Sequence, residues 1–171
     1  MKVVLFGATG MVGQCVLRES ARPDVEAVLA IVRKTTLPQH VKLREIVHQD
    51  VSDVSAIEDR LAGFDACVFC LGVSAVGLKE EEYRRLTFDL PVSVTRTLAK
   101  LNPTMTFIYV SGAGTDSTER GRLMWARVKA ERKTRCWRCR SKLFTCFAHF
   151  TFNLFTALAR RRRGMAHSTL L

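Results

Sequence analysis

The sequence predicts an α/β protein built on a doubly wound parallel sheet, with helices on both faces of the sheet. Short apolar runs alternate along the chain with segments of helical spacing, which is typical of β-α-β units. Most of these runs show little alternation with polar residues, as expected for strands buried on both faces. The length of 171 residues and the content of 47% hydrophobic and 25% charged residues fit one globular domain and exclude a wholly disordered chain.

Five strands are expected, each of them a run of apolar or β-branched residues that stops at a glycine or at polar residues. The first run, KVVLF, stops at Gly7, and the fourth stops at Gly72. The second stops at two basic residues, the third at a histidine and the fifth at a serine. The five runs cover residues 2–6, 25–32, 43–47, 66–71 and 106–110.

Helical spacing of apolar residues predicts four helices between and after these strands. The first of them ends before Pro23, because a proline disfavours helical backbone in the residue before it. The third contains Pro91, which lacks the amide hydrogen that a helix interior uses, so an irregularity is expected there. The four segments cover residues 11–21, 54–61, 80–101 and 121–132.

Charge divides the chain near Glu131. Residues 1–131 hold 17 of the 27 Lys and Arg residues and all 16 Asp and Glu residues, an excess charge of +1. Residues 132–171 hold the other 10 basic residues and no acidic residue, an excess of +10. We therefore expect a folded domain over 1–131 and a basic, aromatic tail over 132–171.

The cysteines do not indicate a disulfide framework. Cys67 and Cys70 form a C-x-x-C pair inside an apolar run, and residues three apart on a strand point to opposite faces of the sheet. We expect two core thiols there and no metal site. The first six residues lack the apolar length of a secretion signal, so a cytoplasmic location is expected.

A glycine-rich turn, Gly7-Ala-Thr-Gly10-Met-Val-Gly13, follows the first strand and opens the first helix. In this position Gly7 permits a tight turn, Gly10 lets the backbone approach a pyrophosphate, and Gly13 allows close packing of helix on strand. The helix N-terminus adds free amide groups and the positive end of a dipole. The pattern predicts a dinucleotide site, with a purely structural turn as the alternative.

Arg33 and Lys34 end the second strand, with Arg33 twenty residues after Gly13. An acidic residue at this position selects NAD through its ribose hydroxyls, whereas a cation suits the 2′-phosphate of NADP. A guanidinium binds phosphate through paired N–H donors, so NADP is favoured and NAD stays possible. Two solvated basic residues at a strand end are the alternative.

Six motifs occur in order between residues 1 and 131: GATGMVG, VRK, HQDV, FCLG, YVSGAG and MWARVKAE. Together they resemble the atypical short-chain dehydrogenase/reductases, and within these the small NAD(P)H-binding, epimerase-like oxidoreductases. The resemblance implies a Rossmann-like fold with the 2′-phosphate near Arg33. It also implies pyrophosphate, adenine and ribose contacts at Thr9, Gly10, Met11 and Val12, at Asp50 and Val51, and at Leu71 and Gly72, respectively.

The resemblance implies a catalytic serine after the fifth strand and a Y-x-x-x-K pair, which Ser111 and Lys129 match in part. In the wider family the lysine lowers the pKa of the tyrosine, whose phenol exchanges a proton with the substrate. Trp125 stands at the tyrosine position, and an indole N–H is a donor only. Either another group, such as Ser111 or a water, transfers the proton, or the protein binds NADP(H) without efficient turnover.

The tail permits four interpretations. Cys136, Cys139, Cys146 and His149 could hold zinc in a nucleic-acid-binding knuckle, although their spacing matches no common class. The uncharged residues 143–159 could contact a membrane, and the arginines at 160–163 could contact phosphates non-specifically. The favoured interpretation is an altered reading frame, because acids and prolines vanish while arginine and cysteine rise; it leaves five strands and a C-terminally incomplete sheet.

We therefore expect an NADP(H)-binding oxidoreductase or epimerase-like protein that transfers hydride with a small carbonyl or sugar-nucleotide substrate. Trp125 and the missing substrate region leave a second hypothesis open, a non-catalytic NADPH sensor or partner-binding module. A third is nucleic-acid or membrane interaction through the tail, and no specific nucleic acid is expected. The sequence identifies neither the substrate nor the oligomeric state.

Overall fold

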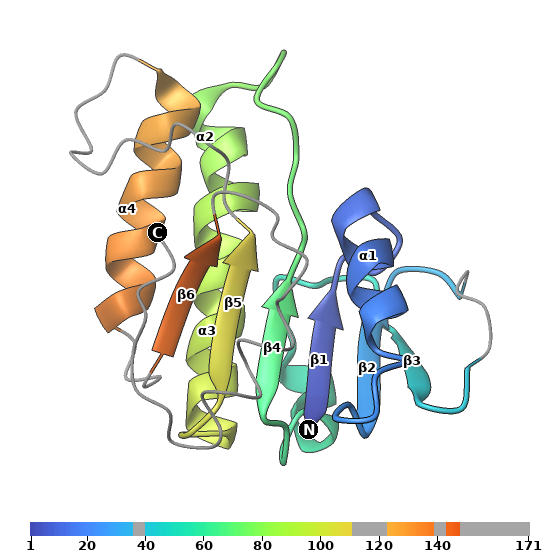
Figure 1. Cartoon of the computed structure of the whole chain (residues 1–171). Helices are drawn as coiled ribbons and strands as arrows, with labels where there is room; N and C mark the ends of the chain where they lie inside the picture. Colours follow the sequence, from blue (N-terminus) through green and yellow to red (C-terminus); the bar gives the residue numbers. More distant parts are fainter. Residues whose placement is uncertain (36–39, 111–122, 139–142, 148–171) are drawn as a thin grey trace.

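The computed structural model describes residues 1–35, 40–110, 123–138 and 143–147, and for 132–138 and 143–147 it describes the backbone only. Six parallel strands form one sheet in the order β3-β2-β1-β4-β5-β6 (Figure 1). The strands are β1 Lys2–Phe6, β2 Ala27–Val32, β3 Leu43–Val47, β4 Ala66–Phe69, β5 Thr106–Val110 and β6 Leu143–Phe147. The predicted doubly wound, Rossmann-like α/β fold is confirmed.

The five expected strands all form, with small changes at their ends. β2 begins at Ala27 and β4 ends at Phe69, so both are shorter than the apolar runs that predicted them. β1 lies in the middle of the sheet, with β2 on one side and β4 on the other. The order of the strands therefore reverses at β1, and loops after β1, β2 and β4 are neighbours at the carboxyl edge.

The described sheet contains one strand more than the five expected, because part of the predicted tail forms β6. Leu143–Phe147, the sequence LFTCF in the predicted tail, pairs in parallel with β5 over five residues, from Thr106–Leu143 to Val110–Phe147. An unpaired edge of β5 would leave a row of N–H and C=O groups without strand partners, and the short apolar run supplies them. The composition of the tail as a whole concealed this local strand signal.

The helices follow the predicted segments with different ends. They are α1 Met11–Glu19, the 3₁₀ helix η1 Ser55–Arg60, α2 Glu80–Arg84, the π-helix η2 Arg85–Asp89, α3 Leu90–Leu101 and α4 Met124–Arg138. The irregularity expected at Pro91 lies in the preceding turn, as η2. An N–H at residue 91 would bond to the carbonyl of Thr87, and the widened turn accommodates its absence.

Two hydrophobic clusters cover the two faces of the sheet. On one face Phe6 and Phe69 pack with α3 and η1, and on the other Leu5 and Val68 pack with α1. Cys67 belongs to the first cluster, and Cys70 packs against the second. The prediction that this C-x-x-C pair points to opposite faces is confirmed.

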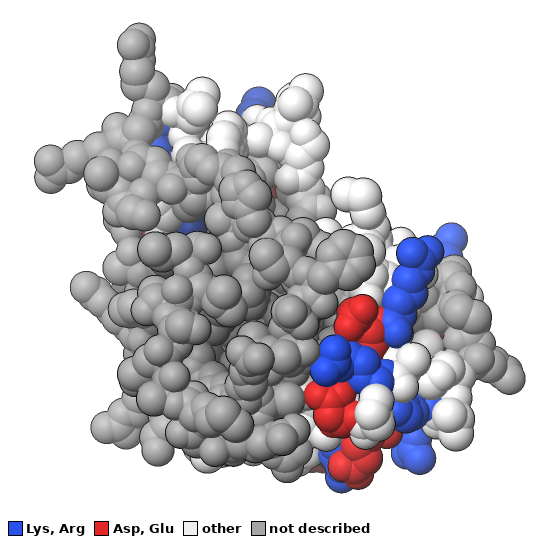
Figure 2. Space-filling view, viewed as in Figure 1, with Lys and Arg blue, Asp and Glu red and all other residues white. Residues whose placement is uncertain are grey.

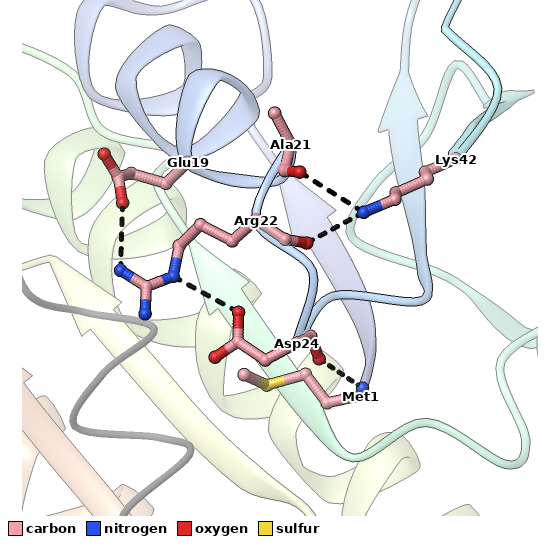
Figure 3. A network of polar contacts seen from close by, with 6 residues as sticks. All are labelled: Met1, Glu19, Ala21, Arg22, Asp24 and Lys42. Atoms are coloured by element: carbon pink, nitrogen blue, oxygen red, sulfur yellow. Dashed lines mark hydrogen bonds and ion pairs between the residues drawn. The ribbon is translucent and has the colours of Figure 1, made fainter.

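A network of polar contacts closes the amino edge of the sheet (Figure 3). The N-terminal ammonium of Met1 donates to the Asp24 carbonyl at 2.7 Å, and Arg22 Nε lies 3.2 Å from Asp24 Oδ1. Lys42 Nζ donates to the Arg22 carbonyl at 2.8 Å. On the face of the molecule that Figure 2 shows, basic and acidic side chains lie next to one another at the lower right. These contacts hold together the connections that precede β1, β2 and β3. They lie at the amino ends of the strands and not at the carboxyl ends.

Candidate functional site

Two glycines of the loop after β1 are required by the chain itself. Gly7 has a φ of +81°, and a Cβ there would lie 2.8 Å from the carbonyl carbon of Cys70. A Cβ on Gly13 would lie 2.1 Å from the Gly7 oxygen. Both positions therefore exclude a side chain, because the loop after β1 lies against the loop after β4 and α1 lies against the loop.

Gly10 differs from the other two. Its φ is −75° with ψ of 164°, a conformation that any residue adopts. A Cβ on Gly10 would have the Gly7 oxygen as its nearest neighbour, at an ordinary contact distance of 3.5 Å. Gly10 is exposed, so a side chain there would fill space in front of the loop. Among the residues that the structure describes, neither backbone strain nor a close contact requires glycine at this position.

The N-terminus of α1 opens onto the same space. The first amides of an α-helix, here those of Met11, Val12 and Gly13, have no carbonyl in a preceding turn. No side chain caps this end. Gln14 Nε2 donates to the Ala8 carbonyl at 2.9 Å and so holds the loop from beneath. A nine-residue helix with free amides and a positive dipole end can bind an anionic group there.

The loops after β2 and β3 adjoin this turn. Phe6 pairs with Ile31, which places Gly7 level with Val32 and the exposed Arg33 and Lys34 directly beyond it. Gln49 Nε2 donates to the Arg33 carbonyl at 2.9 Å and ties the two loops together. The guanidinium of Arg33 makes no ion pair with any acidic residue in the described part of the chain.

Asp50 and Val51 lie in the loop after β3. Asp50 is exposed, and hydrogen bonds from the Ser52 hydroxyl and amide lower the pKa of its carboxyl group. Val51 is half-buried and packs against the cluster that contains Ile46. The carboxyl edge therefore presents a charged acceptor beside an apolar surface at this point, beyond the basic residues of the neighbouring loop.

A cavity of about 180 Å³ lies at the carboxyl ends of β4 and β5. It brings together three residues that the sequence analysis singled out, Leu71, Gly72 and Lys129. The other lining residues are Cys70, Val73, Tyr83, Thr87, Tyr109 and Val110. Arg33, Lys34, Asp50 and Val51 lie on the far side of the glycine loop and do not line it.

Lys129 reaches the cavity from α4. Its Nζ lies 5.7 Å from the centre of the Trp125 ring, one helical turn earlier, which is within the range of a cation–π interaction. Trp125 itself packs against a third hydrophobic cluster, which includes Tyr83 and Val128. The predicted catalytic Ser111 lies outside the described residues.

Tyr83, Thr87 and Tyr109 escaped the sequence analysis. Tyr83 and Thr87 are almost fully buried on α2 and η2, and Tyr109 is almost fully buried on β5. The predicted helix over 80–101 contained two of them, but its periodicity did not show that one of its faces would meet α4. The available signal was the rarity of tyrosine, of which the chain has only two.

The structure describes only part of the tail, so it bears on few of the interpretations proposed for residues 132–171. Residues 143–147 form β6, so the uncharged stretch 143–159 begins as a strand. Within the described residues, no helix has the length and apolar composition needed to cross a bilayer. The same residues contain no cluster of three or more potential metal ligands. The side chains of Cys136, Cys139, Cys146 and His149 and the arginines at 160–163 lie outside the described set.

Comparison with known proteins gives matches over most of the chain. Residues 7–135 match a family model described as NAD(P)H-binding. The Leucinostatins biosynthesis cluster protein T of Purpureocillium lilacinum is 28% identical over 137 residues, which cover 78% of this chain and 51% of that protein. The chain thus spans about half the length of this curated relative.

Solved structures share the fold. The oxidoreductase ylbE from Lactococcus lactis has a TM-score of 0.65 and 20% identity, with 85% of this chain and 67% of that chain covered. The Bordetella bronchiseptica enzyme WbmG, solved in complex with NAD, has a TM-score of 0.66 and 14% identity, with 85% and 52% covered. At these identities the similarity is one of fold.

Proposed function

The chain belongs to the NAD(P)H-binding family, and from that premise we propose that it binds NADP(H) and transfers hydride between this nucleotide and a small carbonyl substrate. The observation that carries the proposal is Gly10. Among the described residues, a Cβ at residue 10 would meet no atom closer than the Gly7 oxygen at 3.5 Å, and this residue directly precedes the free amides of α1. Close approach of a diphosphate to the backbone would explain why this residue is a glycine.

The nucleotide would lie along the carboxyl edge of the sheet. Arg33, with Lys34 beside it, would bind the 2′-phosphate and so favour NADP over NAD. The diphosphate would meet Thr9, Gly10, Met11 and Val12, the adenine would lie near Asp50 and Val51, and the ribose of the nicotinamide would lie along Leu71 and Gly72. When bound, the nucleotide supplies or accepts the hydride.

The cavity beside Lys129 would receive the substrate. Its volume of about 180 Å³ is below the roughly 300–1,000 Å³ of pockets for drug-sized ligands, which favours a small carbonyl compound over a sugar nucleotide. Lys129 is the cationic side chain among the lining residues. A cation there would stabilise negative charge that develops on a substrate oxygen.

A second function is a non-catalytic NADPH-binding module. Trp125 favours it, because an indole supplies no general acid where the wider family has a phenol. Nucleotide binding without turnover of any carbonyl compound would support this function. Oxidation of NADPH that depends on an added carbonyl would exclude it.

Gly10→Ala tests the binding site. We expect the affinity for NADPH, measured by fluorescence titration, to fall about tenfold or more, because the Cβ holds the diphosphate away from the amides. The free energy of unfolding should change by less than about 1 kcal/mol, as for exchanges of glycine and alanine at helix N-caps. Gly13→Ala is the contrasting variant, which should destabilise the fold because its Cβ meets the Gly7 oxygen. Unchanged NADPH affinity in a folded Gly10→Ala protein would contradict the proposal.

Arg33→Ala tests the choice of nucleotide. We expect NADPH affinity to fall about tenfold, the cost of a lost charge-assisted hydrogen bond, while NADH affinity changes little. Arg44→Ala removes an exposed arginine from within β3 and should alter neither. Equal losses for both nucleotides in Arg33→Ala would show that Arg33 does not select the 2′-phosphate.

A further inference from the structure

The loop between β4 and α2, residues 70–79, is apolar although it extends away from the sheet. Figure 1 shows it in green, running beyond the carboxyl ends of the strands before it reaches α2. Residues 66–78 contain no charged residue, and Ser74 is the one polar side chain between Gly72 and Lys79. Ligand-binding clefts have mainly apolar walls, and this loop has the composition of such a wall.

Three apolar side chains of this segment lead from the cavity to the surface. Leu71 is partly buried, packs against the first hydrophobic cluster and lines the cavity. Val73 also lines the cavity but is 43% exposed, so it lies at the mouth. Val76, farther along the same loop, is 88% exposed. We call Leu71, Val73 and Val76 the apolar track.

The position of Val76 at the surface is fixed by its neighbours. Ala75 and Leu78, before and after it, are partly buried and pack against the third hydrophobic cluster. The Val76 amide donates to the Ser74 hydroxyl at 3.2 Å. Gly77 has a φ of +78°, a conformation that glycine adopts readily. Because the loop is anchored on both sides of Val76, the exposure of this side chain is a property of the folded loop.

The cavity is too small for a long substrate. At about 30 Å³ for a group the size of water, its volume of about 180 Å³ accommodates about six non-hydrogen atoms. The carbonyl group must meet the nicotinamide inside, so the rest of a larger substrate extends past Val73. Hydroxyl groups on that part would lose hydrogen bonds to water against valine side chains, whereas methylene groups gain free energy by leaving water. The mouth of the cavity therefore favours a hydrocarbon chain.

We propose that the substrate is an aliphatic aldehyde or ketone of about six carbons or more, whose hydrocarbon chain leaves the cavity over Val73 and lies on Val76; this inference rests on the proposed function and names its substrate class. Single exposed apolar residues are common on protein surfaces. Val41, 94% exposed and two residues before β3, is an example. Val73 and Val76 differ from it because they continue the wall of a cavity.

The first test measures the binding of alcohols, which cannot accept hydride from NADPH. The molecule n-butanol fits inside the cavity, whereas n-octanol is long enough to reach the apolar track. Calorimetric titration of wild-type protein saturated with NADPH should show n-octanol binding about tenfold tighter or more, from about twofold for each half-buried methylene group. Equal affinities, or tighter binding of n-butanol, would overturn the proposal.

The double variant Val73→Thr/Val76→Thr tests whether the chain lies on the apolar track. Threonine keeps the branched shape of valine and introduces a hydroxyl that the chain would deprive of water. We expect the preference for n-octanol to fall to about threefold or less, with little change for n-butanol. Val41→Thr is the matched control and should keep the full preference.

Urea unfolding shows whether the variants are folded, which is expected because both valines are exposed. Val76→Thr alone, at the more exposed position, is the second variant and should lose part of the preference. A folded double variant with the preference of wild type would overturn the proposal.

Turnover of NADPH with butanal, octanal and glyceraldehyde tests the substrate class directly. We expect the highest kcat/KM for octanal. The highest value for glyceraldehyde, or NADPH binding without turnover of any aldehyde, would overturn the aliphatic substrate. Absence of NADPH binding would instead refute the proposed function. The alcohol titrations repeated without nucleotide would then decide separately whether the apolar track binds hydrocarbon chains, because a retained preference for n-octanol supports it and a lost one overturns it.

Discussion

At the scale of single residues, the two cysteines Cys67 and Cys70 have a role in packing that follows from their burial. Cys70 follows β4 directly, lies against the glycine loop and lines the cavity. Burial, and secondly the proximity of Cys15, raise the pKa of the Cys70 thiol to about 12. Cys67, on the opposite face, has its pKa raised by burial as well. Both residues therefore act as neutral packing groups near neutral pH.

This pKa predicts a loss of stability in alkali. The unfolded thiol ionises near its ordinary pKa of 9.0 while folded Cys70 keeps its proton until about pH 12. The contribution of Cys70 is thus complete below pH 9 and is lost as the pH rises toward 12. Between about pH 7 and 10.5 we expect it to decrease by about 2 kcal/mol. Urea unfolding under reducing conditions should show this decrease in wild type and a smaller one in Cys70→Ala. Parallel pH profiles for the two proteins would contradict it.

At the same scale, the glycine loop could be predicted from the sequence, and the place of Tyr83 in the cavity wall could not. Gly7 and Gly13 are recognised because their spacing follows a strand and opens a helix, and the structure forbids a Cβ at both. Tyr83 belongs to no local sequence pattern, because its burial and its place at the cavity depend on which element packs on α2. Long-range polar contacts share this property. Asn102, for example, accepts hydrogen bonds from the Gly63 and Phe64 amides at 2.7 and 3.0 Å, across nearly 40 residues of sequence.

At the scale of the elements, the strands were predicted better than the helices. Five apolar runs predicted five strands because burial on both faces leaves a clear signal in the sequence. The break in the helix over 80–101 was predicted from Pro91, but its position was displaced into Arg85–Asp89. A missing N–H acts on the carbonyl one turn earlier, so the proline predicts a defect and not its exact site. β6 was missed because the charge and cysteine content of the tail outweighed five apolar residues.

The contact between α2 and α4 can be measured through Arg84 and Glu131. Their paired hydrogen bonds raise the pKa of Arg84, and the two side chains are 37% and 34% exposed, so solvent weakens the pair. In a double-mutant cycle with Arg84→Met and Glu131→Gln we expect a coupling free energy of about 1 kcal/mol. It should decrease in high salt.

The matched control for that cycle is the exposed pair Lys2–Glu26, whose atoms lie 3.7 Å apart. Its coupling should be close to zero, because a longer contact between more exposed side chains gains little. Urea unfolding of each set of four proteins provides both values. Equal couplings for the two pairs would show that the Arg84–Glu131 pair adds no more to stability than an exposed pair does.

Over the whole molecule, the amino ends and the carboxyl ends of the parallel strands differ in how their polar groups are used. The amino edge is closed by contacts between residues of the chain itself, which Figure 3 shows around Met1 and Arg22. The carboxyl edge holds the open turn at Gly10, the exposed Arg33 and the cavity beside Lys129. All these site residues precede residue 132, whereas β6, which pairs only with β5 among the described strands, comes after it.

This division predicts that the last residues of the chain support the fold more than they support nucleotide binding. A chain that ends at Arg138 keeps α4 and Lys129 and lacks β6. We expect its unfolding free energy to fall by a few kcal/mol, since the edge of β5 loses its partner and apolar surface is exposed. Under conditions where it remains folded, its NADPH affinity should stay within about threefold of wild type, because the loops after β1 and β2 are untouched. Urea unfolding and NADPH titration of the two chains give both quantities. Stability equal to that of the full chain would mean that β6 contributes nothing to folding, and a folded truncated chain without NADPH affinity would place part of the nucleotide site beyond residue 138.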